Sequence, residues 1–498
     1  MKILQTILNW NYWEKYLWVT MLFWGFIYSI ISLVNHYNFR TYGFDLGIFI
    51  NEIYDYQHGH WNDPTLYYKS IYVSNLLADH FSITSLFITP IANVLGSYTL
   101  LVIQIIAILL GGYGIYKYVF YKSNNKATAH LFTFHFFCIW GVFSAVSYDF
   151  HYNVIGTMCV PYIFLYLEQK KWLKFTLFAF LLITSKENMA LWGAFIGLGL
   201  AWLHYKDKSI RSASLFFAFV SIAHFLFVLK IFVPMFAERY NHFKYALLGN
   251  TMGETIKTMV LQPIIPLKGL FFNHLPNTIG NNIKMESNIV FLLSGGILLF
   301  WRPQYLFMLL PIFTQKYFNN DVIKWGTKYQ YCIEFLPIIA LGSYTVYEHW
   351  LISKKRYSTY IPISLLLTTS ICTIKITQSP ISVYHDRAIT TFWSPTHYAT
   401  DYKNVAAIHT ALNSIPIEAV VSADNCFVPH VAYRDTVYLF PDVRRETDYI
   451  AIKNDTTPDL WPNKDNPALT KKWIKELQNT AIYTPVLVNE DVIIVKKK

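Results

Sequence analysis

Long apolar runs recur along most of this chain, and they constrain its fold more than any other feature. The first runs from Tyr16 to Val34 and is about long enough to cross a bilayer. Only 14% of the 498 residues are charged, whereas soluble domains carry about 25%. The sequence therefore predicts an α-helical, multi-pass membrane protein.

About eleven transmembrane helices can be drawn from these runs. They cover residues 16–34, 98–119, 128–147, 152–168, 174–188, 190–204, 212–232, 287–301, 303–318, 331–351 and 357–376. The apolar stretch 81–95 contains Pro90 and is short for a full span. We expect that stretch to form a re-entrant or interfacial helix.

Lysines and arginines gather in alternate loops between the predicted spans, around Lys122, Lys170, Lys206 and Lys355. Cytoplasmic loops carry an excess of these residues, so the pattern predicts a cytoplasmic N-terminus and an extracytoplasmic C-terminus. We expect the protein in a bacterial inner (plasma) membrane. The net charge of +11 is spread over these short clusters, which fits contact with the lipid bilayer and does not indicate a nucleic-acid partner.

This topology divides the chain into two predicted parts. Residues 1–376 would form the transmembrane domain, with outer loops at 35–97 and 233–286. Residues 377–498 alternate helical and strand-like patterns, which predicts a small extracytoplasmic α/β domain. That tail has no glycine-rich phosphate loop, so a soluble nucleotide-binding role is not supported.

Four motifs with ionisable side chains fall at the ends of spans, and the topology puts all of them on the outer side. They are Phe44-Asp45-Leu46-Gly47, Asp79-His80, Asp149-Phe150-His151 and Lys186-Glu187-Asn188. Ionisable groups at membrane depth cost ~2.5–3.5 kcal/mol each on insertion scales. A cluster of them is therefore a hypothesis for a functional site.

Asp45 lies about ten residues after the first span, between apolar neighbours. A partly desolvated carboxylate suits a proton acceptor or a metal ligand. The alternative is a helix N-cap, because Asp before an apolar run satisfies free backbone N–H groups.

Adjacent carboxylate and imidazole groups can share a divalent cation. Asp79, Asp149 and His151 are therefore candidate metal ligands, and a divalent metal ion is the one cofactor that the sequence suggests. His80 is a candidate substrate contact. The alternatives are helix caps for the acids and a place at the lipid headgroups for His80.

Lys186 and Glu187 interrupt an otherwise apolar stretch. They predict a phosphate-facing ammonium beside a catalytic carboxylate, or else an ordinary hairpin turn with a Lys–Glu pair. Tyr329 and Tyr331 open a later span. They are candidate substrate contacts, and the alternative is the aromatic belt of the membrane interface.

With these motifs located, the chain resembles a bacterial family of polytopic membrane proteins classed as a domain of unknown function. The resemblance is carried by Phe44–Phe49, His80-Phe81-Ser82 with Pro90, Asp149-Phe150-His151, Lys186-Glu187, Tyr329-Gln330-Tyr331, Pro429–Arg434, Val437-Tyr438 and Phe440-Pro441. Two positions depart from the family pattern: Asn51 stands where Gln is usual, and Asn188 stands where Asp is usual.

That family is in turn similar to the GT-C superfamily of membrane glycosyltransferases. The resemblance implies a polyprenyl-phosphate-linked sugar as donor, an acidic residue in the first outer loop and an outer C-terminal domain. By position after the first span, Asp45 matches that acid.

The resulting hypothesis is glycosyl transfer from a polyprenyl-phosphate sugar to an acceptor at the outer face. Asp45 would take the acceptor's proton, and Lys186, His80, His151 or a metal ion would neutralise the departing phosphate. Two alternatives stay open: a transporter or flippase of an envelope precursor, and a non-catalytic scaffold for envelope assembly.

Overall fold

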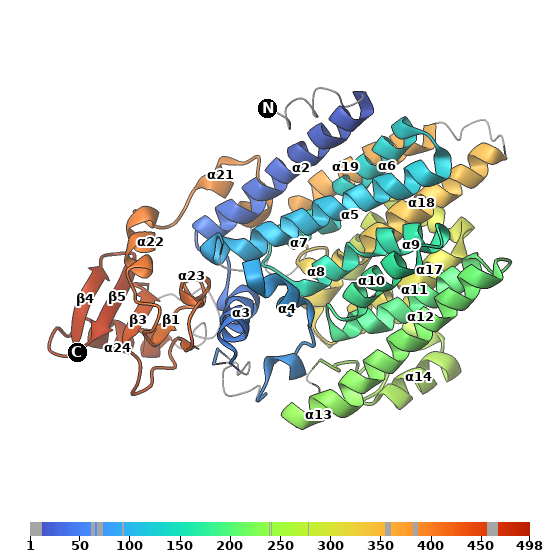
Figure 1. The fold of residues 1–498 in the computed structure, drawn as a ribbon. Coiled ribbons are helices and arrows are strands. Elements are labelled where there is room, and N and C mark those ends of the chain that lie inside the picture. The colour runs from blue at the N-terminus through green and yellow to red at the C-terminus, as the bar shows by residue number, and fades with distance from the viewer. Residues whose placement is uncertain are drawn as a thin grey trace.

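The computed structural model describes residues 12–60, 65–66, 73–91, 94–238, 240, 242–276, 278–353, 360–381, 387–455 and 467–498. A bundle of helices makes up most of the molecule, and a small sheet lies beside one end of that bundle (Figure 1). Short helices of the first predicted outer loop lie between the two parts. The two parts are therefore joined through the loop that carries Asp45.

The helices of the bundle follow the predicted spans closely. Its first half contains α2 (Tyr12–Tyr37), α5 (Thr99–Ser123), α6 (Lys126–Cys138), α7 (Trp140–Val146), α8 (Tyr152–Thr157), α9 (Val160–Glu168), α10 (Trp172–Ile183), α11 (Glu187–Leu203) and α12 (Lys208–Phe227). Its second half contains α16 (Ile283–Leu293), the 3₁₀ helix η6 (Gly296–Trp301), α17 (Pro303–Tyr317), α18 (Phe335–Ile352) and α19 (Ile361–Thr377). Each predicted span therefore falls on a helix or on two short helices in succession.

Not all of these helices are long enough to cross a membrane alone. Among the described residues, three helical stretches are long and apolar enough: Tyr12–Tyr37, Gly96–Ser123 and Lys208–Phe236. The pair α6 and α7 makes a fourth if it crosses as one span, with a bend of 49° at an extended Ile139. The number of eleven crossings therefore stays a prediction.

Large apolar side chains project outward from the surface of the bundle. Leu22 and Phe26 on α2 are 70% and 65% exposed, and Phe216 and Phe219 on α12 are 68% and 69% exposed. Proteins in water seldom leave such surfaces open, whereas lipid chains cover them at no cost. These surfaces agree with a bundle that lies in a bilayer.

Glycines allow some helices of the bundle to approach closely. A β-carbon on Gly112 of α5 would lie 2.1 Å from the Phe137 ring of α6. One on Gly197 of α11 would lie 2.7 Å from the backbone oxygen of Ser214 on α12. Small residues at helix contacts are typical of membrane bundles, where packing replaces the hydrophobic effect.

The two predicted outer loops contain short helices. Loop 35–97 holds α3 (Ile48–His58), the 3₁₀ helix η2 (Leu76–Ala78), α4 (Thr84–Ile88) and the 3₁₀ turns η3 (Thr89–Ile91) and η4 (Gly96–Tyr98). Loop 233–286 holds α13 (Val233–Phe236), α14 (Met252–Leu261) and α15 (Ile264–Gly269). The described part of stretch 81–95 forms only α4 and η3, so it has no full-length helix. Its position relative to the membrane stays a prediction.

The C-terminal region mixes helices and strands, as its sequence pattern predicts. It contains α20 (Arg387–Thr390), α21 (Pro395–Tyr398), α22 (Val405–Asn413), α23 (Val428–Val431) and α24 (Pro467–Leu477), with strands β1 (Val421–Ala423), β2 (Val437–Leu439), β3 (Tyr449–Lys453), β4 (Tyr483–Val488) and β5 (Val492–Lys497). The described strands form one sheet in the order β2-β1-β3-β5-β4, in which β1 is parallel to β2 and β3 while β5 is antiparallel to β3 and β4. Pro485 lies in β4, at the edge of the described sheet. Proline is tolerated in an edge strand because its missing N–H does not interrupt the pairing of two inner strands.

The two faces of this sheet bury different partners. On one face, Ile450 and Val495 pack with residues of α24. On the other face, Ala451 and Ile494 share a core with Leu46 and other residues of the first outer loop. Because side chains alternate along a strand, one sheet serves both layers. The C-terminal region thus shares a hydrophobic core with the loop that carries Asp45.

Candidate active site

Asp45 lies in a turn, Gly43–Gly47, that the C-terminal region holds in place. Its backbone has φ of 80° and ψ of −92°, an unusual conformation for a residue with a side chain. The N–H groups of Gly43 and Phe44 donate to Oδ1 of Asn425 at 2.8 and 3.3 Å. A β-carbon on Gly47 would lie 2.7 Å from the Val428 side chain, so only glycine fits against α23 there. Such strain persists only where the surroundings fix the backbone, and here the C-terminal region does so.

The carboxylate of Asp45 faces two side chains from the segment between α7 and α8. The Tyr148 hydroxyl donates to Oδ2 at 2.9 Å, and Nε2 of His151 lies 3.6 Å from the same oxygen. The Asp45 side chain is 27% exposed. The following helix, α3, has Gly47 at its N-cap and no side-chain capping bond. The helix-cap interpretation of Asp45 is therefore wrong, and its carboxylate is accessible to a substrate.

Asp149 also supports this turn. It is buried, and its Oδ2 accepts a hydrogen bond of 3.0 Å from the N–H of Tyr42. Burial raises the pKa of the Asp149 carboxyl well above its usual range, and the nearby Asp45 charge raises it further. Burial also lowers the pKa of His151 to about 4; Asp45 opposes that shift, while Lys186 and His80 add to it. His151 is thus neutral at pH 7 and lies between the Asp45 turn and the Lys186 motif.

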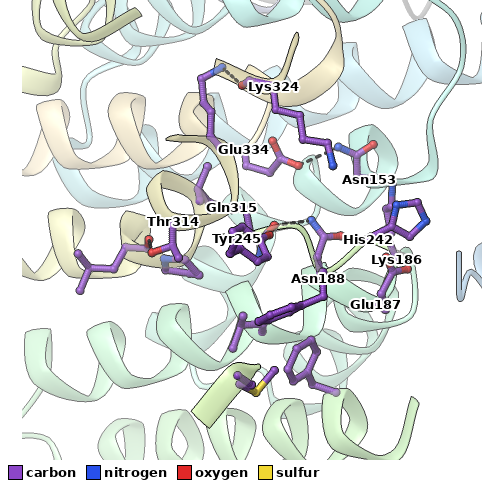
Figure 2. A pocket seen from close by; sticks show the side chains of 18 of the residues that line it. Asn153, Lys186, Glu187, Asn188, His242, Tyr245, Thr314, Gln315, Lys324 and Glu334 are labelled. Atoms are coloured by element: carbon purple, nitrogen blue, oxygen red, sulfur yellow. Dashed lines mark hydrogen bonds between the residues drawn. The ribbon is translucent and has the colours of Figure 1, made fainter. Parts of the chain in front are cut away.

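A cavity of about 400 Å³ lies between α11, α12, α17 and the second outer loop. Figure 2 shows side chains of its polar part, including Lys186, Glu187, Asn188, His242 and Lys324. Asn188 donates to Oε1 of Gln315 at 2.9 Å, and Asn153 donates to Oε1 of Glu334 at 2.8 Å. These hydrogen bonds connect side chains of the cavity wall.

Three lysines line the cavity. The ammonium of Lys316 donates to the backbone oxygens of Lys324 and Gly326, which leaves Lys186 and Lys324 to supply positive charge. Lys186 precedes α11 in an extended conformation, and Lys324 comes from the 3₁₀ helix η7 (Val322–Trp325). Burial, together with repulsion from Lys186, lowers the pKa of Lys324 to about 8. Because the two ammonium groups repel each other, an anion that binds near both of them is stabilised.

Glu187 is buried and takes part in a network of hydrogen bonds. Its Oε1 accepts from the Tyr240 hydroxyl at 2.9 Å and lies 3.3 Å from Nδ1 of His80, and its Oε2 accepts from the N–H of Phe81 at 3.2 Å. The carboxylate therefore joins the first outer loop, the second outer loop and the start of α11. The simple hairpin interpretation of the Lys-Glu motif does not account for these contacts.

Asp79 lies beside His80 and a histidine from the second outer loop. Its Oδ1 lies 2.8 Å from Nε2 of His242, and its Oδ2 lies 3.9 Å from Nε2 of His80. The rings of His80 and His242 stack with their centroids 4.3 Å apart. Among the described residues, Asp79, His80 and His242 form one of two groups with metal-ligand spacing. Asp149 and His151 are in neither group, because Asp149 binds the Tyr42 backbone and His151 faces Asp45.

The rest of the cavity wall is apolar. Side chains of α11, α12, the helical turn η5 (Val228–Phe232), α14 and α17 make up this part, among them Leu191, Phe195, Phe225, Leu229, Met252, Ile256, Met259 and Leu310. A charged group can therefore bind at one end of the cavity while hydrocarbon fills the other.

The structure brings the predicted site residues into two adjoining groups. His80, Lys186, Glu187 and Tyr331 line the cavity, whereas Asp45, Asp79, Asp149, His151 and Tyr329 are not among its lining residues. The two groups meet through aromatic rings: Tyr329 packs edge-on against Tyr148, with centroids 4.7 Å apart, and lies 6.5 Å from Tyr331.

Sequence reasoning missed several residues of the site. Tyr240, His242 and Lys324 lie in loops without a recognisable motif, so only the fold brings them to the cavity. Tyr148 directly precedes the Asp149 motif. A phenol beside a predicted site is a signal that would have identified it.

A family model described as predicted membrane protein (DUF2079) matches residues 35–494. The chain belongs to this family. The match covers every motif of the two groups, from the Asp45 turn to the C-terminal region that holds it. The match confirms the family resemblance that these motifs predicted.

Among solved structures, the DUF2079 chain is similar to ArnT from Cupriavidus metallidurans, which was crystallised bound to undecaprenyl phosphate. The TM-score is 0.50 over 97% of both chains, with 10% sequence identity. This likeness confirms the distant GT-C resemblance for the fold. A comparison with curated proteins found no match.

Proposed function

We propose that this DUF2079 protein is a membrane glycosyltransferase that moves a sugar from a polyprenyl-phosphate donor to an acceptor at the outer face of the inner membrane. The observation that carries this proposal is the cavity, which joins a cationic end to a long apolar wall. A polyprenyl-phosphate sugar has the same two parts. The fold shared with ArnT, a protein crystallised with undecaprenyl phosphate, supports the same class of lipid.

The donor phosphate binds between Lys186 and Lys324, and the isoprenoid chain lies along the apolar wall. In the reaction, the bond between the sugar's anomeric carbon and the phosphate oxygen breaks, and a bond from that carbon to the acceptor oxygen forms. The lipid phosphate leaves with one additional negative charge. Lysine ammonium groups that face this phosphate stabilise the charge as it develops, which lowers the barrier.

Asp45 takes the proton that the acceptor hydroxyl loses. Its carboxylate is accessible, the Tyr148 hydroxyl orients it, and the His151 ring lies beside it. Tyr331 lies at the junction between the cavity and the Asp45 group. The acceptor approaches along the C-terminal region, which adjoins this turn. Glu187 holds His80 and Tyr240 in place beside the donor.

The test is transfer by purified protein from radiolabelled polyprenyl-phosphate sugars, assayed with extracts of envelope glycans as acceptor. Turnover of at least one donor, lost in Lys186→Met, supports the proposal. No turnover of any donor, together with protein-dependent movement of a lipid-linked sugar across vesicles, would replace it with the transporter or flippase.

A further inference from the structure

The group formed by Asp79, His80 and His242 has features of a metal site. One liganding atom from each residue lies within 4.8 Å of the other two. The two imidazole Nε2 atoms face separate oxygens of the same carboxylate, at 3.9 Å for His80 and 2.8 Å for His242. Liganding atoms on a tetrahedral zinc ion lie about 3.3 Å apart. Small side-chain rotations would thus bring the three atoms onto one ion.

Glu187 fixes the orientation that His80 needs for this role. Its Oε1 lies 3.3 Å from Nδ1 of His80, and the Tyr240 hydroxyl donates to the same oxygen. A proton held on Nδ1 by this carboxylate leaves the lone pair of His80 on Nε2, the nitrogen nearer Asp79. Histidine ligands of metals are commonly oriented by a carboxylate on their other nitrogen in this way.

The charge of the group favours a divalent cation. Asp79 and Glu187 are only 7% and 3% exposed in their side chains and contribute two negative charges around two imidazoles. Buried carboxylates of this kind favour a nearby cation, and Lys186 supplies part of that positive charge at Glu187. A ligand set of two nitrogens and one oxygen suits zinc, with a fourth position left open.

We propose that Asp79, His80 and His242 bind one zinc-like divalent ion at the rim of the cavity, with Glu187 orienting His80. His80 and His242 both line the cavity, so the open position faces it. The ligands come from both predicted outer loops, and the ion would therefore tie the second loop to the first. This site does not depend on the proposed transfer reaction.

The test uses full-length protein in detergent, stripped with a chelator and then titrated with Co²⁺, which reports its geometry by its visible spectrum. We expect one tight ion per chain with the intense bands of tetrahedral cobalt, displaced by Zn²⁺. His80→Ala and His242→Ala should each weaken binding by at least about tenfold, and Glu187→Gln by about 10–100-fold with the tetrahedral bands retained.

His349→Ala is the matched control, because this histidine is exposed in the last turn of α18 and belongs to neither candidate group. It should bind cobalt as the wild type does. A wild-type spectrum without tetrahedral bands overturns the proposal whether or not any variant folds. So does unchanged affinity in folded His80→Ala and His242→Ala. Loss of sugar transfer alone tests only the proposed function, because cobalt binding is measured without a substrate.

Discussion

The hydroxyl of Tyr148 donates a hydrogen bond of 2.9 Å to Oδ2 of Asp45, across 103 residues of sequence. The next residue, Asp149, accepts a hydrogen bond from the backbone of the same turn. One short segment between α7 and α8 therefore orients the Asp45 carboxylate and supports its backbone. Asp149 is buried, whereas the Asp45 side chain is 27% exposed.

Asp45→Asn should remove the proton acceptor while it keeps the shape of the turn. Transfer should fall about 10²–10⁴-fold, the usual range for general base catalysis. The thermal midpoint of the purified variant should stay close to that of the wild type, because the side chain is partly exposed. An Asn variant with full activity would exclude Asp45 as the base.

Lys324 predicts a pH dependence of donor binding. With a pKa of about 8, the Lys324 side chain is positively charged below this pH and loses its charge above it. Because a phosphate binds the charged form, the donor KM should rise between pH 7 and pH 9, by up to about tenfold for each unit above the pKa. Lys324→Arg stays charged and should flatten this rise, whereas Lys324→Met should bind weakly at every pH. A wild-type KM that is constant over this range would remove Lys324 from the phosphate site.

Asn425→Ala should disturb the active site from the C-terminal region. The variant removes the Asn425 side-chain acceptor of the Phe44 N–H and one of two acceptors of the Gly43 N–H, at a cost of about 1–3 kcal/mol in stability. Transfer should fall with little change in donor KM, since the lysines are untouched. Asn454→Ala is the matched control, because Asn454 bonds Asn489 within the C-terminal region. Equal losses of transfer in both variants would mean general destabilisation of that region.

Membrane topology can be tested by fusions. Lys122 pairs with Glu168 at 2.7 Å and Lys170 pairs with Asp207 at 2.9 Å, so three loops predicted to be cytoplasmic meet in the structure. A C-terminal alkaline phosphatase fusion should be active and a C-terminal fluorescent fusion dark. Tags near Lys122, Lys206 and Lys355 should stay cytoplasmic; Lys355 lies outside the described residues. The reverse pattern would turn the cavity toward the cytoplasm and contradict the proposed reaction.

Local patterns were enough to predict much of the fold. A long apolar run predicts a membrane helix wherever it occurs in a chain, so the predicted spans matched helices from α2 to α19. Strand β3 lies within the tail whose alternating pattern predicted a mixture of helices and strands. The bend between α6 and α7 was not predicted. That bend depends on packing around Ile139 and not on a local signal such as proline.

The site was predictable only in its conspicuous residues. Asp45 and Lys186-Glu187 stand out because they are charged among apolar neighbours. His242 does not, and its partner Asp79 is 163 residues away along the chain. The predicted pairing of Asp79 with Asp149 and His151 followed from residue type alone. Residue type alone does not show that the Asp149 carboxylate already accepts a hydrogen bond from the backbone N–H of Tyr42.

The bond between Gly43 and Asn425 spans 382 residues of sequence. During synthesis, the turn that carries Asp45 leaves the ribosome early, while its support is made only near the end. A chain that stops before Asn425 would contain Asp45, His80, Asp149, Lys186 and Glu187 but would lack the backbone that holds Asp45 in its strained conformation. Incomplete copies of the protein would therefore reach the membrane with every predicted catalytic side chain and no working site.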